Sequence, residues 1–81
     1  MKDNIFDLNK KDILTIFANR LKELMNFQSL SIAQLSQKIN IPKSTINCWL
    51  LKIRSPQIDS LVAIAEYFGV TTDYLLGRED I

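Results

Sequence analysis

Apolar residues recur along this chain at three- and four-residue intervals, the spacing that places them on one face of an α-helix. The first such stripe consists of Ile13, Phe17, Leu21 and Leu24. It predicts a helix that runs to about Phe27. Asn9 and Asp12 stand at its start with the spacing of a helix-capping pair.

The next segment is shorter and has sharper end signals. Ser31 is a candidate N-cap, and the inner face of the helix after it would carry Ile32, Leu35, Ser36 and Ile39. Asn40 stands where a left-handed residue often ends a helix. Pro42 disfavours helical geometry at Ile41, so this helix cannot continue, yet Pro42 itself suits the first turn of a new one.

A third helix over about 43–52 follows, with two different faces. One face carries the apolar residues Ile46, Trp49 and Leu50, with Ile53 as the next position of the stripe. The other face carries Lys43, Ser44, Asn47 and Cys48. We expect Trp49 in the core rather than as an exposed stacking platform, because it shares a stripe with Ile46.

The remaining pattern predicts two more helices after a loop at residues 54–57. The fourth helix carries the stripe Ile58, Leu61, Ile64, Ala65 and Phe68. Gly69 would close it, and Thr71 would cap a last short helix that runs through Leu76 and ends at Gly77. Because no strand pattern or internal repeat appears, we expect an all-α, compact five-helix bundle.

Composition narrows the class of protein. With 81 residues and 47% hydrophobic content, the chain predicts one domain at 12–77, a tail or extra turn at 1–11 and a tail at 78–81. There is no histidine and one cysteine, so we expect no internal disulfide, no metal site, no cofactor and no enzymatic activity. No apolar run has the length of a membrane span or signal peptide, which predicts a cytoplasmic protein without a membrane partner.

Charge is distributed unevenly, although the whole chain carries only +1. From Leu24 to Ile58 there are 35 residues without Asp or Glu. Its basic residues are Lys38, Lys43, Lys52 and Arg54, so its formal charge is +4. A helix pair without negative charge suits a polyanion such as DNA. The alternative is a chance gap in a small protein.

These residues, at these spacings, resemble the phage repressor/Cro-like (XRE-type) helix-turn-helix family. The resemblance covers about 13–77, with the motif at about 31–52. The matching residues are Leu30–Ser31, Leu35–Ser36, Ile39–Ile41, Lys43–Ile46 with Trp49, Arg54–Pro56, Leu61, Ile64–Ala65 and Phe68–Gly77. It implies a transcriptional regulator, of a phage or mobile element, that binds double-stranded DNA as a homodimer through the helix at about 43–52 in the major groove.

The resemblance also implies roles for individual residues. Ser44, Asn47 and Cys48 would meet base edges, with Lys43 and Thr45 beside them at phosphates. Further phosphate contacts would come from Ser31, Lys52 and Arg54. The alternatives are an ordinary solvated face for these residues, local capping for Thr45, and an unreactive thiol or a redox sensor for Cys48.

The chain departs from the family pattern at three places. Ile32 replaces a residue that is often polar, which leaves Ser31 and backbone N–H groups for the phosphate contact. Lys52 replaces a frequent glycine, so we expect a different cap at that helix end. Leu50, Leu51 and Ile53 replace polar residues, and are either packed core or a surface for a protein partner.

Two expectations about assembly complete the analysis. The dimer contact is expected at the C-terminal helix around Tyr74–Leu76, helped by Ile5 and Phe6. The alternative function is a protein-interaction adaptor that has the helix-turn-helix fold and does not read DNA.

Overall fold

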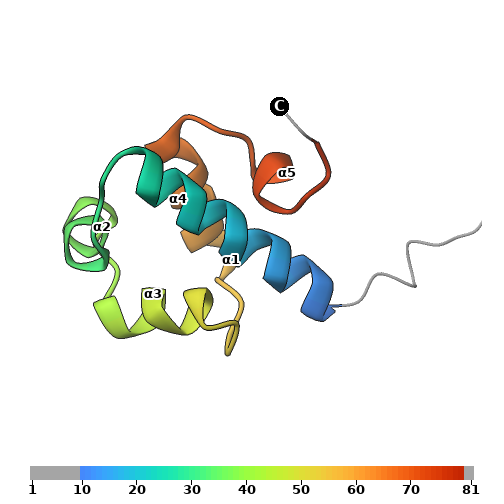
Figure 1. Cartoon of the computed structure of the whole chain (residues 1–81), viewed down its shortest axis with the longest axis horizontal. Helices are drawn as coiled ribbons and strands as arrows, with labels where there is room; N and C mark the ends of the chain where they lie inside the picture. Colours follow the sequence, from blue (N-terminus) through green and yellow to red (C-terminus); the bar gives the residue numbers. More distant parts are fainter. Residues whose placement is uncertain (1–9, 80–81) are drawn as a thin grey trace, which may run out of the picture.

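The chain forms an array of helices wrapped around one long N-terminal helix (Figure 1). The computed structural model describes residues 10–79, and side chains from Asp12 onward. This part contains five helices and no strand: α1 (Lys10–Phe27), α2 (Ile32–Ile39), α3 (Lys43–Leu50), α4 (Ile58–Phe68) and α5 (Thr72–Leu75). The predicted all-α class is confirmed. Asn9, the expected first cap, and Ile5 and Phe6 lie outside the described residues.

The core forms where the apolar stripes of the helices meet. α1 packs against α3 and α5, α2 against α3 and α4, and α4 against α5. The largest fully buried side chains are Trp49, Phe17, Leu21, Leu35, Ile46, Ile64 and Leu75. The rings of Phe17 and Trp49 meet edge to face, with centroids 6.1 Å apart and planes at 75°, which is a favourable arrangement for two aromatic rings. The expected core position of Trp49 is confirmed.

Every described helix is followed by a residue in the left-handed backbone conformation. These residues are Ser29, Asn40, Lys52, Gly69 and Gly77, with φ between 53° and 80°. Such a residue reverses the chain and lets the next amides bond to the last carbonyls of the helix. The predicted roles of Asn40 and Gly69 as left-handed caps are confirmed.

The end of α3 differs from the prediction. The helix ends at Leu50, not at residue 52, because Lys52 turns the chain with φ 62°. The Lys52 N–H donates to the Trp49 carbonyl at 3.0 Å and the Ile53 N–H to the Cys48 carbonyl at 2.9 Å. This pair of bonds is the Schellman cap, so the expectation of a different cap was wrong. Of the two alternatives left open for Ile53, the exposed one holds, because the turn carries it out of the stripe and it is 64% exposed.

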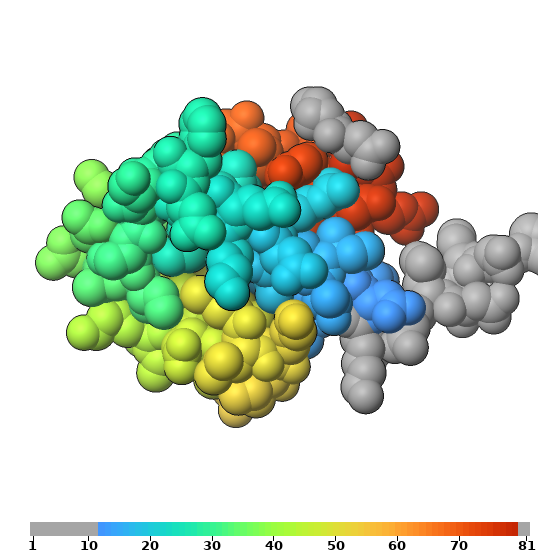
Figure 2. Space-filling model, in the orientation of Figure 1, coloured from blue at the N-terminus to red at the C-terminus, as the bar shows by residue number. Residues whose placement is uncertain are grey.

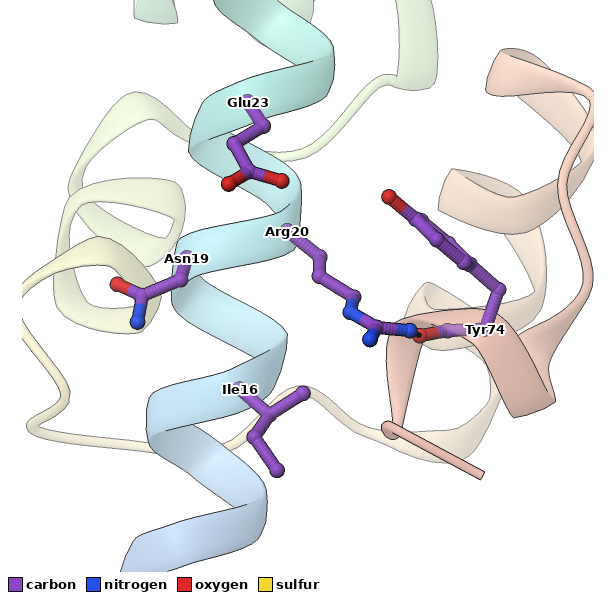
Figure 3. Close-up of a pocket in the computed structure, with 5 residues that line it drawn as sticks. All are labelled: Ile16, Asn19, Arg20, Glu23 and Tyr74. Atoms are coloured by element: carbon purple, nitrogen blue, oxygen red, sulfur yellow. Dashed lines mark hydrogen bonds between the residues drawn. The ribbon is translucent and has the colours of Figure 1, made fainter. Parts of the chain in front are cut away.

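The last helix is fixed to the middle of α1 by one arginine. The Arg20 guanidinium lies 4.4 Å from the centre of the Tyr74 ring, and its Nη1 donates to the Tyr74 carbonyl at 2.5 Å and to the Glu79 carbonyl at 2.8 Å. Figure 3 shows this side chain reaching from α1 toward Tyr74. The Thr71 hydroxyl accepts the Tyr74 N–H at 2.9 Å, which confirms Thr71 as the cap of α5.

Candidate nucleic-acid interface

The turn between α2 and α3 holds the two helices in a fixed relation. In Figure 1, α2 is seen nearly end-on while α3 lies across the page, so the helices cross steeply. Only residues 40–42 connect them, with Asn40 in the left-handed conformation at φ 58°. The Ile41 N–H donates to the Ser36 carbonyl at 3.2 Å, and the Ser36 hydroxyl donates to the Ile41 carbonyl at 2.6 Å. Ser36, noted in the sequence as a small inner residue, therefore also ties the turn to α2.

α3 has one buried and one exposed face. Ile46 and Trp49 are 0% and 1% exposed and anchor the helix in the core. Ser44 and Asn47 are exposed on the opposite side, and Cys48 is half-buried beside them. Positions 44, 47 and 48 are three and four residues apart, so they share one side of the helix. We call these three residues the α3 face.

The N-terminus of α3 is open to an anion. Pro42 occupies the N-cap position, just before the first helical turn in which the sequence analysis placed it. No side chain caps the helix there. The N–H groups of Thr45 and Ile46 donate to the Pro42 carbonyl, at 3.1 and 3.2 Å. The amides of the first turn at Lys43 and Ser44 have no partner within a helix and carry the positive end of its dipole. Lys43 adds an exposed ammonium group at the same place.

Ser31 begins α2 with a reciprocal cap. Its hydroxyl oxygen accepts the Gln34 N–H at 3.1 Å, and the Gln34 side chain accepts the Ser31 N–H at 2.8 Å. The hydroxyl hydrogen of Ser31 is left to donate outward. Gln34 was missed as part of this site, although Ser31 and Gln34 have the Ser-x-x-Gln spacing of a capping box. Ile32 packs partly against the core, which explains an apolar residue at this place.

Lys52 and Arg54 follow α3 and are both exposed. Both lie in the loop between α3 and α4. Figure 2 shows α2, α3 and this loop forming a continuous surface along the left and lower sides of the molecule. Since residues 24–58 contain no acid, this whole segment offers only positive or neutral groups.

The three apolar residues at the end of α3 separate into two groups. Leu50 packs partly against the core, so it offers little to a partner. Leu51 is 59% exposed and Ile53 is 64% exposed. Leu51 lies three and four residues after Cys48 and Asn47, so it extends the α3 face toward the loop. The sequence left open whether Leu51 is packed core or an exposed surface, and the structure shows it exposed.

Two further findings concern other classes of site. Among the described residues, no helix is long and apolar enough to cross a membrane. Within residues 10–79, no three side chains of His, Cys, Asp or Glu are grouped as a metal site would need. Cys48 is a free thiol.

Known proteins are similar to parts of this chain in sequence, and a solved structure is similar in fold. The chain is 34% identical over 65 residues to the HTH-type transcriptional regulator YobD of Bacillus subtilis, a match that covers 80% of this chain and 58% of YobD. It is 29% identical to ImmR of the same organism, over 76% of this chain and 49% of ImmR, and 29% identical to the transcriptional activator BcrR of Enterococcus faecalis, over 80% and 32%. The chain thus spans about half the length, or less, of these relatives.

Among solved structures, the SOS-response transcriptional repressor LexA from Eubacterium rectale has a similar fold. The TM-score is 0.80, with 20% sequence identity, and the match covers 91% of this chain and 79% of that one. At this identity the likeness concerns the fold.

The steep helix pair and the exposed α3 face define a helix-turn-helix domain of the phage repressor (XRE) type. The family model for helix-turn-helix domains matches residues 21–75, and the chain belongs to this family.

Proposed function

We propose that the chain is a sequence-specific DNA-binding transcriptional regulator that places α3 in the major groove of double-stranded DNA. The exposed α3 face, opposite a fully buried face on the same helix, carries this proposal. Asparagine can pair bidentately with adenine, and serine can bond to several bases. We assign base contacts to Ser44, Asn47 and Cys48.

Phosphate contacts surround this face in the proposed complex. The uncapped start of α3, with Lys43 and Thr45, and the start of α2, with Ser31, present N–H, hydroxyl and ammonium donors. Lys52 and Arg54 extend the positive surface beyond the other end of α3. The absence of acids between residues 24 and 58 supports this assignment, because a single carboxylate there would repel the DNA backbone.

The salt dependence of DNA binding tests the proposal. Fluorescence anisotropy with a labelled random-sequence duplex would give the affinity over a range of salt concentrations. Three cations per protomer, and six per dimer, predict a slope of log K against log salt of about −5. Selection from a random DNA pool would then yield the operator. A slope near zero, or a selected pool without a common sequence, would contradict the proposal.

We also propose that the protein binds as a homodimer through α5, with half-sites about one helical turn of DNA apart. Leu75 is fully buried in its own core, so the contact surface is left to Tyr74 and Leu76, which are half-buried. Arg20 reaches from α1 to the Tyr74 ring and contacts it (Figure 3). Sedimentation of the protein and footprinting of both half-sites would test this arrangement.

The remaining proposals concern the sign of regulation, the location, the origin and a protein partner. The relatives point to transcription control, and their names include two regulators of unstated sign and one activator, so they do not decide the sign. A cytoplasmic location and an origin in a phage or mobile element are consistent with this class. Exposed Leu51 and Ile53 are the observation that favours an additional protein partner. The adaptor that reads no DNA is not favoured by the family match.

A further inference from the structure

A groove of about 670 Å³ lies between the first turns of α1, the loop after α3, and the residues at the start of α4 and the end of α5. Phe17, which is 1% exposed, lies at its base. Its other apolar lining residues are Ile13, Leu14, Ile53, Pro56, Leu61 and Leu76. The volume falls within the range of about 300–1,000 Å³ that is usual for binding clefts. Lys52 and Arg54 also line it, and none of its lining residues is acidic.

We propose that this groove is the docking site of residues 1–9 of the same chain. Ile5 and Phe6 would enter the groove, and Asp3 and Asp7 would face the two cations. Residues 1–9 carry a net charge of −1, from Asp3 and Asp7 against Lys2, and the apolar residues Ile5 and Phe6 lie between the two carboxylates. The groove has apolar walls beside Lys52 and Arg54, so the two are complementary. Ile53 is apolar and 64% exposed, and the docked segment would cover it.

The length of the segment fits this path. α1 begins at Lys10, and its groove-lining residues Ile13 and Phe17 are about 5 and 11 Å along the helix axis from that point. Phe6 precedes Lys10 by four residues and so can reach about 13 Å from it. Asn9 stands between them and suits a reversal of the chain. Phe6 can therefore lie over the groove while the chain turns back along α1.

One consequence rests on the proposed function. Lys52 and Arg54 are the cations that we assign to DNA phosphates at the end of α3. Carboxylates of Asp3 and Asp7 placed beside them would compete with the phosphates, so the docked segment would weaken DNA binding. The segment would then act as an internal competitor of DNA.

Docking is tested by proton–proton NOEs in the full chain with labelled Ile, Leu and Val methyl groups. We expect NOEs from the Phe6 ring to the methyl groups of Ile53 and Leu61, and their loss in Phe6→Ser, with shift changes confined to the groove. Phe27→Ser is the matched control, because Phe27 is 88% exposed and does not line the groove. Absent Phe6 NOEs would overturn the proposal. NOEs found only between labelled and unlabelled molecules would overturn it too, and would assign the groove to a second copy.

Competition with DNA is tested separately. The double variant Asp3→Asn/Asp7→Asn should bind random-sequence DNA more tightly than the parent at low salt. The matched control is the double variant Glu23→Gln/Glu66→Gln, which removes the same charge elsewhere. The rise in affinity should be at least about threefold larger in the first variant than in the control. An equal rise in both variants would overturn the competition. If no variant binds DNA, the proposed function fails, while the NOEs still decide whether the segment docks.

Discussion

Gly77 tests whether the approach of α5 to α1 is as close as the structure shows. Its φ is +80°, and a Cβ built on it would lie 2.9 Å from Cγ2 and 3.0 Å from Cδ1 of Ile16. Gly69 is the matched position: its φ is +70°, and a Cβ there would meet nothing within 4 Å. Alanine at Gly69 therefore adds only backbone strain, whereas alanine at Gly77 adds strain and a steric clash.

The two contributions can be given magnitudes. A left-handed alanine costs roughly 1–2 kcal/mol, and the reduced freedom of the unfolded chain offsets about 0.4–1 kcal/mol of this. We therefore expect Gly69→Ala to destabilise by roughly 1 kcal/mol. Overpacking adds about 1–3 kcal/mol at Gly77, because Cγ2 belongs to a β-branched side chain that is stiff on a helix.

Urea unfolding of both variants measures the difference, and substitution of Ile16 identifies its source. Ile16→Ala removes both clashing atoms and should rescue Gly77→Ala with a coupling energy of about 1–3 kcal/mol. Ile16→Val keeps Cγ2 and should rescue it only in part. Equal destabilisation of the two glycine variants, or no coupling to Ile16, would refute the close approach of the two segments.

Four other substitutions give distinct outcomes. Trp49→Ala should destabilise the domain by about 3–5 kcal/mol in urea unfolding, because it removes a buried aromatic residue; a parental midpoint would contradict the packing against Phe17. Lys52→Gly should stabilise by roughly 0.5 kcal/mol, since relief of left-handed strain exceeds the added entropy of the unfolded chain; a loss would contradict the strain. Lys43→Ala should weaken binding to all DNA sequences alike and flatten the salt slope by about 1 per protomer, measured by anisotropy; an unchanged slope would remove Lys43 from the phosphates. Asn47→Ala should relax preference at one base pair per half-site by about 1–3 kcal/mol and leave non-specific binding nearly intact; an unchanged preference in footprinting would remove Asn47 from the base contacts.

The sequence predicted the helices well because their ends carry local signals. Ser31, Asn40, Gly69 and Thr71 act through their own side chain or backbone conformation, and each was found in its expected role. The apolar stripes predicted most of the core for a similar reason, since the helical period decides which residues share a face. Ile58 is an exception: it stands in the predicted stripe of α4 and is 83% exposed.

The error at a helix end lies at α3, where Lys52 takes the left-handed position that glycine would favour. At Lys52 the tertiary structure imposes a left-handed conformation on a residue that does not favour it, so the apolar period appeared to continue to Ile53. Ser29 shows the same behaviour at the end of α1. The sequence likewise predicted which side of α3 is exposed, but exposed Leu51 and the groove beside Ile53 depend on how distant segments pack.

The hydrogen bond between the Ser36 hydroxyl and the Ile41 carbonyl has a consequence for how DNA would be read. The amide and the carbonyl of Ile41 are both bound to Ser36, and Asn40 is left-handed, so these contacts restrict movement of α3 relative to α2. A helix-turn-helix restricted in this way would adapt its shape little to each operator. In the proposed complex the duplex would bend or twist instead, and the energy of that deformation would depend on base steps that the protein does not contact. Part of the selectivity would then reside in the stiffness of the DNA between the two half-sites.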